Sequence, residues 1–293
     1  MSAPTTGRLR VPGACLHYEV RGRGPLLLLI PGGTGGAAAF DGVADALAAE
    51  YTVASYDPRG LSRSPLDAPE PGRSVAEQSV AEHAEDALRL LDLLSPAEPA
   101  RIFGSSSGAI AALHLLTARP ERLVRLVAHE PPVVEVLPDA PVHRALLARV
   151  RDTLDAEGLV PAMGVFAAGL KKEGEADGNG QAPATPGPEL PPAELPPAAA
   201  ARAARTMADL PYFLGRIVPG FMAYSPDLGR LEAVSDRLVL AGGADSRGEL
   251  PYRTAAFLAD RFGSELLHFP GGHTGLTTHP AGFGEVLGQA FRK

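Results

Sequence analysis

The sequence predicts an α/β protein with a mostly parallel, twisted sheet of about eight strands flanked by helices. Two observations predict this fold class. Short apolar runs of strand length recur along the 293 residues, and segments with apolar residues at helical spacing separate most of them. Strands that alternate with helices form βαβ units, whose strands pair in parallel. The expected strands cover residues 8–11, 15–20, 25–30, 51–56, 101–103, 123–128, 237–241 and 265–269.

The elements of the N-terminal half follow from local signals. Pro12 and Gly13 join the first two expected strands, which indicates a hairpin. The run PLLLLI over residues 25–30 is apolar throughout, as expected of a strand that is buried on both faces. After the fourth strand, Ser74 begins an expected helix that extends to about Leu94, because Ser-Val-Ala-Glu has the spacing of a capping box. Further helices of the alternating part are expected at residues 108–118, 251–262 and 280–291.

Residues 138–235 interrupt the alternation with helical segments and no strand. We therefore predict a core formed by residues 1–137 and 236–293, with a helical insertion between these two parts. Within the insertion, residues 171–197 are acidic and rich in proline and glycine, and they contain too few large apolar residues to fold, so we expect them to be flexible. The helices of the insertion are expected at residues 142–157, 159–170, 198–208 and 212–224.

The composition restricts the partners of the chain. The formal net charge is −7 and the sequence has no basic cluster, which argues against a nucleic-acid partner. Cys15 is the only cysteine, so neither an intramolecular disulfide nor a cysteine-based metal site is expected. The first residues lack the apolar core of a signal peptide, and no apolar run reaches the ~18 residues of a membrane span. We expect a cytoplasmic protein that acts on a small molecule, away from membranes; the oligomeric state stays open.

Three consecutive serines lie at a junction between an expected strand and an expected helix. The stretch GSSSG, Gly104 to Gly108, matches the motif G-x-S-x-G, in which the central serine lies on a sharp turn and small residues are needed two positions before and after it. Only Ser106 has a glycine at both of these positions, so it is the candidate nucleophile. The alternative is a serine-rich helix start, with Ser105 or Ser107 as the N-cap.

A glycine-rich loop, Gly32 to Gly36, follows the strand at residues 25–30. Such a loop lets backbone N–H groups point into a cleft, and those of Gly33 and Ser107 are the candidate oxyanion-hole donors. The same stretch also fits G-x-G-x-x-A, the dinucleotide-binding pattern, which requires an acidic residue such as Asp57 at the end of the next strand. That alternative leaves the serine motif unexplained.

Asp245 and His273 each follow an expected strand in the C-terminal part. Residues just after parallel strands meet at one edge of a sheet, so both can converge on Ser106, in the order Ser…Asp…His that α/β-hydrolases use. Glu130 follows the strand at residues 123–128 and is an alternative acid. The other histidines show no metal-ligand spacing, and we expect no metal and no cofactor.

The chain resembles the α/β-hydrolase fold superfamily, in particular its single-domain esterases, lactonases and perhydrolases. The resemblance covers nearly everything outside the insertion and is carried by LLLLIPGG, YDPRGLSRS, GSSSGAIAALHLLTARPERLVRLVAHEPP, LVLAGGADS and FPGGHTG. It implies that Ser106 is the nucleophile, His273 the base and Asp245 the acid that orients it. The insertion then corresponds to the lid that this superfamily carries after its sixth strand. One departure is Pro31 in place of the usual histidine before the oxyanion loop.

The implied function is a serine hydrolase that forms an acyl-enzyme with an ester, lactone or thioester of a small, mostly apolar metabolite. Alternatives are a non-hydrolytic enzyme of the same fold (a lyase, a cyclase or a cofactor-free oxidative enzyme), an NAD-type oxidoreductase and a catalytically silent binding protein. The apolar residues of the insertion at helical spacing are expected to wall the substrate pocket, together with the loop residue Thr34. The expected pocket residues are Thr34, Phe166, Phe213, Phe221 and Met222.

Overall fold

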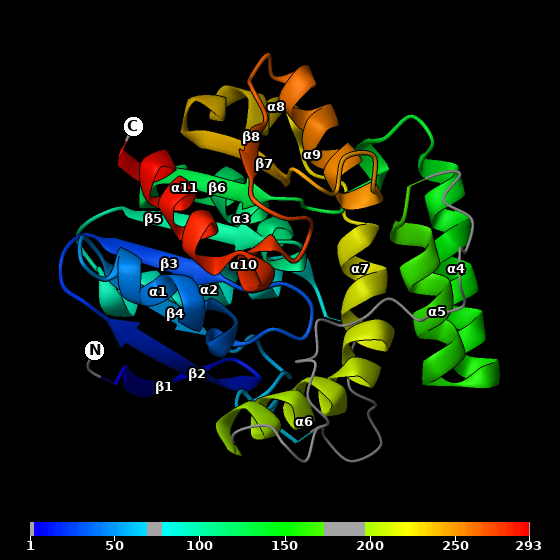
Figure 1. Cartoon of the computed structure of the whole chain (residues 1–293), viewed down its shortest axis with the longest axis horizontal. Helices are drawn as coiled ribbons and strands as arrows, with labels where there is room; N and C mark the ends of the chain where they lie inside the picture. The colour runs from blue at the N-terminus through cyan, green and yellow to red at the C-terminus, as the bar shows by residue number, and fades with distance from the viewer. Residues whose placement is uncertain (1–2, 69–77, 173–196, 293) are drawn as a thin grey trace.

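The computed structural model describes residues 3–68, 78–172 and 197–292. It contains one eight-stranded sheet with the strand order β1-β2-β4-β3-β5-β6-β7-β8 (Figure 1). The first strand pairs β1·β2 and β2·β4 are antiparallel, and all others are parallel. The predicted fold class is therefore confirmed. The strands are β1 (Thr5–Val11), β2 (Ala14–Arg21), β3 (Leu26–Ile30), β4 (Thr52–Tyr56), β5 (Ala100–Ser105), β6 (Leu123–His129), β7 (Leu238–Gly243) and β8 (Leu267–Phe269).

Helices cover both faces of the sheet. One face packs against α1, α10 and α11 around Phe103 of β5, whose ring meets those of Phe40 and Phe283 edge-on. The other face packs against α2 and α3, and the two groups of helices lie on opposite sides of the sheet in Figure 1. Short helical segments without a clear sequence signal, α1 among them, were not predicted. The bounds are α1 (Asp41–Leu47), α2 (Val80–Leu94), α3 (Ser107–Ala118), α8 (Leu228–Ala233), α9 (Leu250–Arg261), α10 (Gly275–Thr278) and α11 (Pro280–Arg292), with 3-10 turns at Ala37–Phe40, Pro120–Arg122, Val134–Val136 and Ser235–Arg237.

The helix α2 begins at a different cap from the one predicted. The sequence contains Ser-Val-Ala-Glu twice, at residues 74–77 and 79–82. The second copy caps α2: the hydroxyl of Ser79 accepts a hydrogen bond from the backbone N–H of Glu82 (3.2 Å) and donates one to its carboxylate (3.0 Å). The predicted cap, Ser74, lies outside the described residues. Two identical capping signals five residues apart cannot be ranked by the motif alone.

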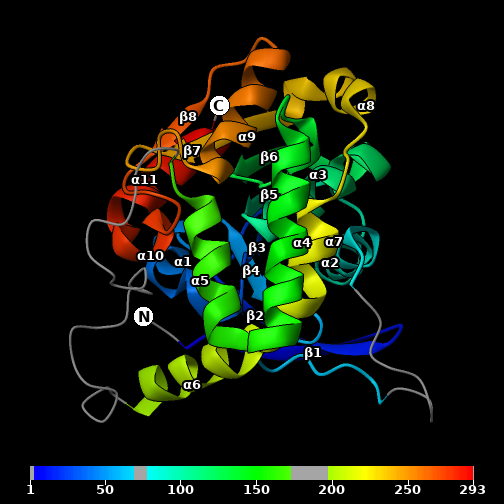
Figure 2. The same ribbon diagram turned by 90° about the vertical axis from the view of Figure 1, so that its right-hand side faces the viewer.

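The insertion between β6 and β7 is helical, as expected. Its helices are α4 (Ala140–Glu157), α5 (Leu159–Leu170), α6 (Pro197–Tyr212), the π-helical turn η5 (Phe213–Ile217) and α7 (Val218–Met222). Viewed from the side, α4 and α5 are outermost and α7 lies behind them, next to the sheet (Figure 2). No helix among the described ranges is long and apolar enough to cross a membrane. The predicted flexible segment, residues 171–197, falls almost wholly outside the described residues, and the division into core and insertion stays a prediction.

His129, the last residue of β6, is a polar side chain inside an apolar part of the core. It is 1% exposed, and its ring packs against those of Phe103, Phe269 and Phe283. Neither ring nitrogen has a hydrogen-bond partner among the described residues. Burial lowers the pKa of His129 to about 4, with a smaller lowering by His273 and a raising by Glu130. The ring is therefore neutral at neutral pH.

We expect His129 to make the fold sensitive to mild acid. The unfolded chain takes up a proton near the ordinary pKa of 6.5, whereas the folded chain resists protonation until about pH 4, so stability falls as the pH drops through this window. In His129→Leu the loss of unfolding free energy between pH 6.5 and 5 should be smaller than in the wild type by on the order of 2 kcal/mol. Urea unfolding at both pH values measures this difference, and an equal loss in both proteins would contradict it.

Candidate active site

The candidate nucleophile Ser106 lies on a sharp turn between β5 and α3. Its backbone has φ 53° and ψ −123°, a left-handed conformation that a serine adopts only under constraint. The two flanking glycines are required by close backbone approach. A Cβ atom on Gly104 would lie 2.7 Å from the Cα of Ala109, and one on Gly108 would overlap the carbonyl oxygen of Ile30. The turn has the geometry that the G-x-S-x-G motif predicts.

The structure brings Ser106 and His273 together. His273 lies in the loop after β8, and its Nε2 is 3.2 Å from Oγ of Ser106. The opposite ring nitrogen, Nδ1, is 2.6 Å from Oε2 of Glu130. These two contacts form a continuous chain from a carboxylate through an imidazole to a hydroxyl. This is the arrangement in which a base can activate a nucleophile while a third group orients the base.

The acid in contact with His273 is Glu130 and not Asp245, which corrects the sequence-based expectation. Asp245 is exposed, and its backbone N–H donates to the carbonyl oxygen of Gly271 (3.0 Å). The strands β6 and β7 are neighbours in the sheet, so their following loops reach the same place. The chain turns at Glu130 with φ 48°, directly after β6, and its carboxylate reaches His273.

The loop after β7 supports the Glu130 carboxylate. Oε1 of Glu130 accepts hydrogen bonds from the backbone N–H of Gly243 (2.8 Å) and from the hydroxyl of Ser246. Glu130 is fully buried, and burial raises its pKa. The hydrogen bond to His273 and the electrostatic attraction of its ring, followed by smaller contributions from His129 and Ser246, outweigh that effect, so the pKa of Glu130 lies below its ordinary value. The carboxylate is therefore ionised at neutral pH.

The two predicted oxyanion-hole residues are also adjacent, but through a contact that the sequence did not predict. Ser107 is the first residue of α3, where a backbone N–H has no carbonyl of its own helix to bond. The backbone N–H of Gly33 donates to the side-chain oxygen of Ser107 (3.1 Å). From the sequence, only the backbone N–H of Ser107 was expected at the site. The hydroxyl of Ser107 thus belongs to the candidate site as well.

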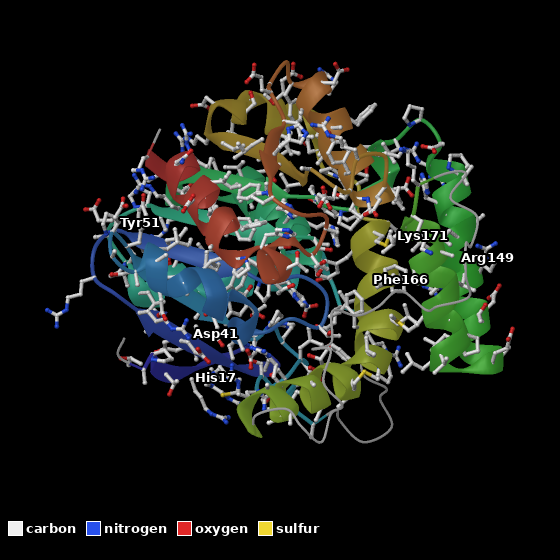
Figure 3. All side chains as sticks on the ribbon, in the orientation of Figure 1. His17, Asp41, Tyr51, Arg149, Phe166 and Lys171 are labelled. Atoms are coloured by element: carbon white, nitrogen blue, oxygen red, sulfur yellow. The ribbon has the colours of Figure 1, made fainter. Side chains whose placement is uncertain are left out.

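A narrow cavity lies beside Gly33 and Ser107. With the side chains as they stand it has room for about one water molecule. Of the predicted pocket residues, Phe221 lines this cavity, whereas Phe166 and Met222 belong to the separate core of the insertion, as Figure 3 shows for Phe166 between α5 and α7. The contact of the other predicted residues with a substrate stays a prediction. The lining residues are Ile30, Pro31, Gly33, Tyr56, Pro58, Leu61, His83, Ser107, Gly108, Ala111, Ile217 and Phe221.

His83 of α2 lines this cavity and was not among the site residues predicted from the sequence. It is 6% exposed, its ring stands edge-on to Phe221, and its Nε2 has no hydrogen-bond partner among the described residues. Burial, and to a lesser extent the charge of Arg59, lowers its pKa to about 3, so the ring is neutral. No sequence motif surrounds His83, and only the fold places it next to the cavity.

The dinucleotide-binding alternative does not fit the surroundings of Asp57. That alternative needs an acidic side chain that can reach a ribose hydroxyl. Asp57 is fully buried; its carboxylate accepts hydrogen bonds from the N–H of Ala37 (2.8 Å) and from the guanidinium Nε of Arg63 (2.7 Å). The oxygens of Asp57 are therefore engaged in hydrogen bonds with the protein's own loops. Across the described parts of the chain, no cluster of three histidine, cysteine or acidic side chains could hold a metal ion.

Comparisons with known proteins agree with the fold. A family model described as the alpha/beta hydrolase fold matches residues 25–276. The chain is 34% identical over 291 residues to a Bacillus subtilis (strain 168) protein named uncharacterized hydrolase YraK, and the match covers 98% of this chain and 96% of that protein.

Two solved structures share the fold. Bromoperoxidase from Bacillus anthracis has a TM-score of 0.71 at 17% identity, over 99% of this chain and 100% of that one. Enol-lactonase from Burkholderia xenovorans LB400 has a TM-score of 0.68 at 16% identity, over 98% of this chain and 100% of that one. Because the family model spans most of the sequence and the Bacillus subtilis relative matches along nearly its whole length, the chain belongs to the alpha/beta hydrolase family.

Proposed function

We propose that this chain is a serine hydrolase that cleaves an ester, lactone or thioester bond of a small, mostly apolar metabolite through an acyl-enzyme on Ser106. The observation that carries the proposal is the chain of contacts from Glu130 through His273 to Ser106, at 2.6 and 3.2 Å. A dinucleotide-dependent reaction or a binding role would leave this arrangement without a purpose. The hydrolase name of the Bacillus subtilis relative, which matches along nearly its full length, and the lactonase of the same fold agree with this proposal.

The first half of the proposed reaction forms the acyl-enzyme. His273 takes the proton of the Ser106 hydroxyl through Nε2 while Oγ attacks the carbonyl carbon. The proton on Nδ1 faces the ionised Glu130, which stabilises the imidazolium that forms and holds the ring in this orientation. The bond to the leaving group then breaks, and His273 gives its proton to the departing alcohol, thiol or ring oxygen.

The second half releases the acyl group. A water molecule attacks the ester on Ser106, gives its proton to His273 and frees the acid, and the proton returns to the serine oxygen. In both halves negative charge develops on the carbonyl oxygen. The backbone N–H of Ser107 at the start of α3 is directed to that region by the turn at Ser106, and the partial positive charge of the helix N-terminus favours an anion there.

The cavity beside Gly33 and Ser107 supports a preference for small acyl groups. It is lined mainly by apolar side chains, among them Ile217 and Phe221, and it is narrow. A long acyl chain would have to displace one of these side chains, both of which are almost fully buried. We therefore propose that short esters are turned over faster than long ones.

The first prediction tests the nucleophile. Ser106→Ala should abolish the turnover of p-nitrophenyl acetate and labelling by a fluorophosphonate, because no other hydroxyl of the described residues is hydrogen-bonded to His273. Ser105→Ala is the matched control, since Ser105 is the preceding serine of the same motif, and it should keep most of the activity. A wild-type protein that neither hydrolyses esters nor takes up the probe would favour a silent binding protein or a non-hydrolytic enzyme.

The second prediction tests the acid. Glu130→Gln should lower kcat by more than about 10²-fold, because an amide at that position no longer stabilises the imidazolium or fixes its tautomer. Asp245→Asn, a matched amide substitution on the neighbouring loop, should leave kcat within about twofold. Circular dichroism and thermal unfolding verify that Glu130→Gln is folded. A larger loss in Asp245→Asn than in Glu130→Gln would refute the assignment of Glu130.

The third prediction concerns substrate size. Phe221→Leu removes ring atoms from the cavity wall and should increase the ratio of activity on p-nitrophenyl hexanoate to that on the acetate by about 10-fold, since each buried methylene contributes roughly 0.8 kcal/mol. Phe213→Leu is the control: Phe213 lies two turns earlier in the same helical stretch and packs against Phe166. If both substitutions shift the ratio equally, this cavity does not hold the acyl group.

A further inference from the structure

We propose that the side-chain hydroxyl of Ser107 is a hydrogen-bond donor of the oxyanion hole: it accepts the N–H of Gly33 and donates its own proton to the substrate carbonyl oxygen. This inference rests on the proposed function and assigns a third group to the same site. The hydroxyl forms no covalent bond and transfers no proton; it stabilises the charge that develops on the carbonyl oxygen as Ser106 attacks.

The backbone amide of Gly33 is directed at Ser107. A backbone N–H has a single hydrogen, and that of Gly33 is directed at the Ser107 oxygen, 3.1 Å away. As long as this bond lasts, the same hydrogen cannot be fully directed at a substrate oxygen. The backbone N–H of Ser107 then remains the one unshared donor of the predicted pair, and a hole with a single donor stabilises an oxyanion poorly.

The hydroxyl of Ser107 has hydrogen-bonding capacity left over for a substrate. A serine hydroxyl has one proton to donate and two lone pairs that accept. One lone pair of Ser107 accepts the Gly33 N–H. Among the described residues the hydroxyl proton has no acceptor within hydrogen-bonding distance, and Ser107 is only partly buried and lines the cavity. The proton is therefore available to a group that enters the site.

Ser107 also lies where its hydroxyl can reach the substrate carbonyl oxygen. Ser107 directly follows the nucleophile, so its side chain and its backbone N–H both lie next to Ser106 at the start of α3. A carbonyl carbon attacked by Oγ of Ser106 has its oxygen within reach of the next residue. Accepting a hydrogen bond polarises a hydroxyl and strengthens the bond that it donates, so the Gly33 N–H acts on the substrate oxygen through Ser107.

The experiment measures steady-state kinetics on p-nitrophenyl acetate and the affinity of phenylboronic acid, a probe that forms a tetrahedral adduct on a reactive serine. The variants are Ser107→Ala, Ser107→Thr and the control Ser105→Ala. Ser107→Ala should lower kcat by about 10²-fold, the effect of removing one oxyanion donor elsewhere, with KM changed by less than about threefold, and it should weaken phenylboronic acid binding. Ser107→Thr keeps the hydroxyl and should recover most of the lost kcat.

Three results would overturn the inference. A kcat of Ser107→Ala within threefold of the wild type would mean that the hydroxyl donates nothing to the transition state. A loss confined to KM or to the melting temperature would assign Ser107 only to bracing the loop at Gly33. An equal loss in a folded Ser107→Thr would point to steric effects. In all three cases wild-type activity that depends on Ser106 shows that the proposed function still holds, whereas its absence would refute both.

Discussion

The site depends on one backbone constraint, the left-handed conformation of Ser106. A non-glycine residue in this region costs on the order of 1–3 kcal/mol and persists only where its neighbours fix it. Here β5 on one side and α3 on the other hold the turn, and the backbone N–H of Ser106 donates to the carbonyl oxygen of His129 on the adjacent strand (2.9 Å). The same contact fixes the end of β6, and with it Glu130, next to Ser106. The sheet thus offsets the strain at Ser106. The side chains of Ser106, Glu130 and His273 meet at the edge of the sheet where these strands end.

Two neighbouring strands, β6 and β7, together form the surroundings of the carboxylate that contacts His273. The sequence offers a carboxylate after β6 and another after β7; Glu130 contacts His273 itself, whereas Asp245 contacts Gly271 of the same loop through its backbone N–H. The Glu130 carboxylate is the one that contacts His273. The end of β7 and the loop after it provide its hydrogen-bond donors, the N–H of Gly243 and the hydroxyl of Ser246. A carboxylate that is fully buried needs such donors to remain ionised. Asp245 lies at the surface of that loop and does not occupy the space of these two donors.

The strands, the serine turn and His273 could be predicted from the sequence because each has a local signal: an apolar run, a pair of glycines at fixed spacing, a residue just after a strand. Asp245 and Glu130 have the same local signal, so their ranking depended on side-chain direction, which is set by the turn at Glu130. The contact of Gly33 with the Ser107 hydroxyl joins residues 74 positions apart. No local sequence pattern predicts such a contact.

The short helix α7 and the turn before it connect the insertion to the site through two adjacent faces. Leu214, Val218 and Met222 recur every four residues and belong to the core that the insertion forms with α4 and α5. Ile217 and Phe221, offset by one position, belong to the main core and line the cavity beside Ser107. Because residues four apart share one face of a helix, these two sets form two apolar stripes on the same segment. This one segment therefore packs against the core of the insertion and lines the cavity beside Ser107 at the same time.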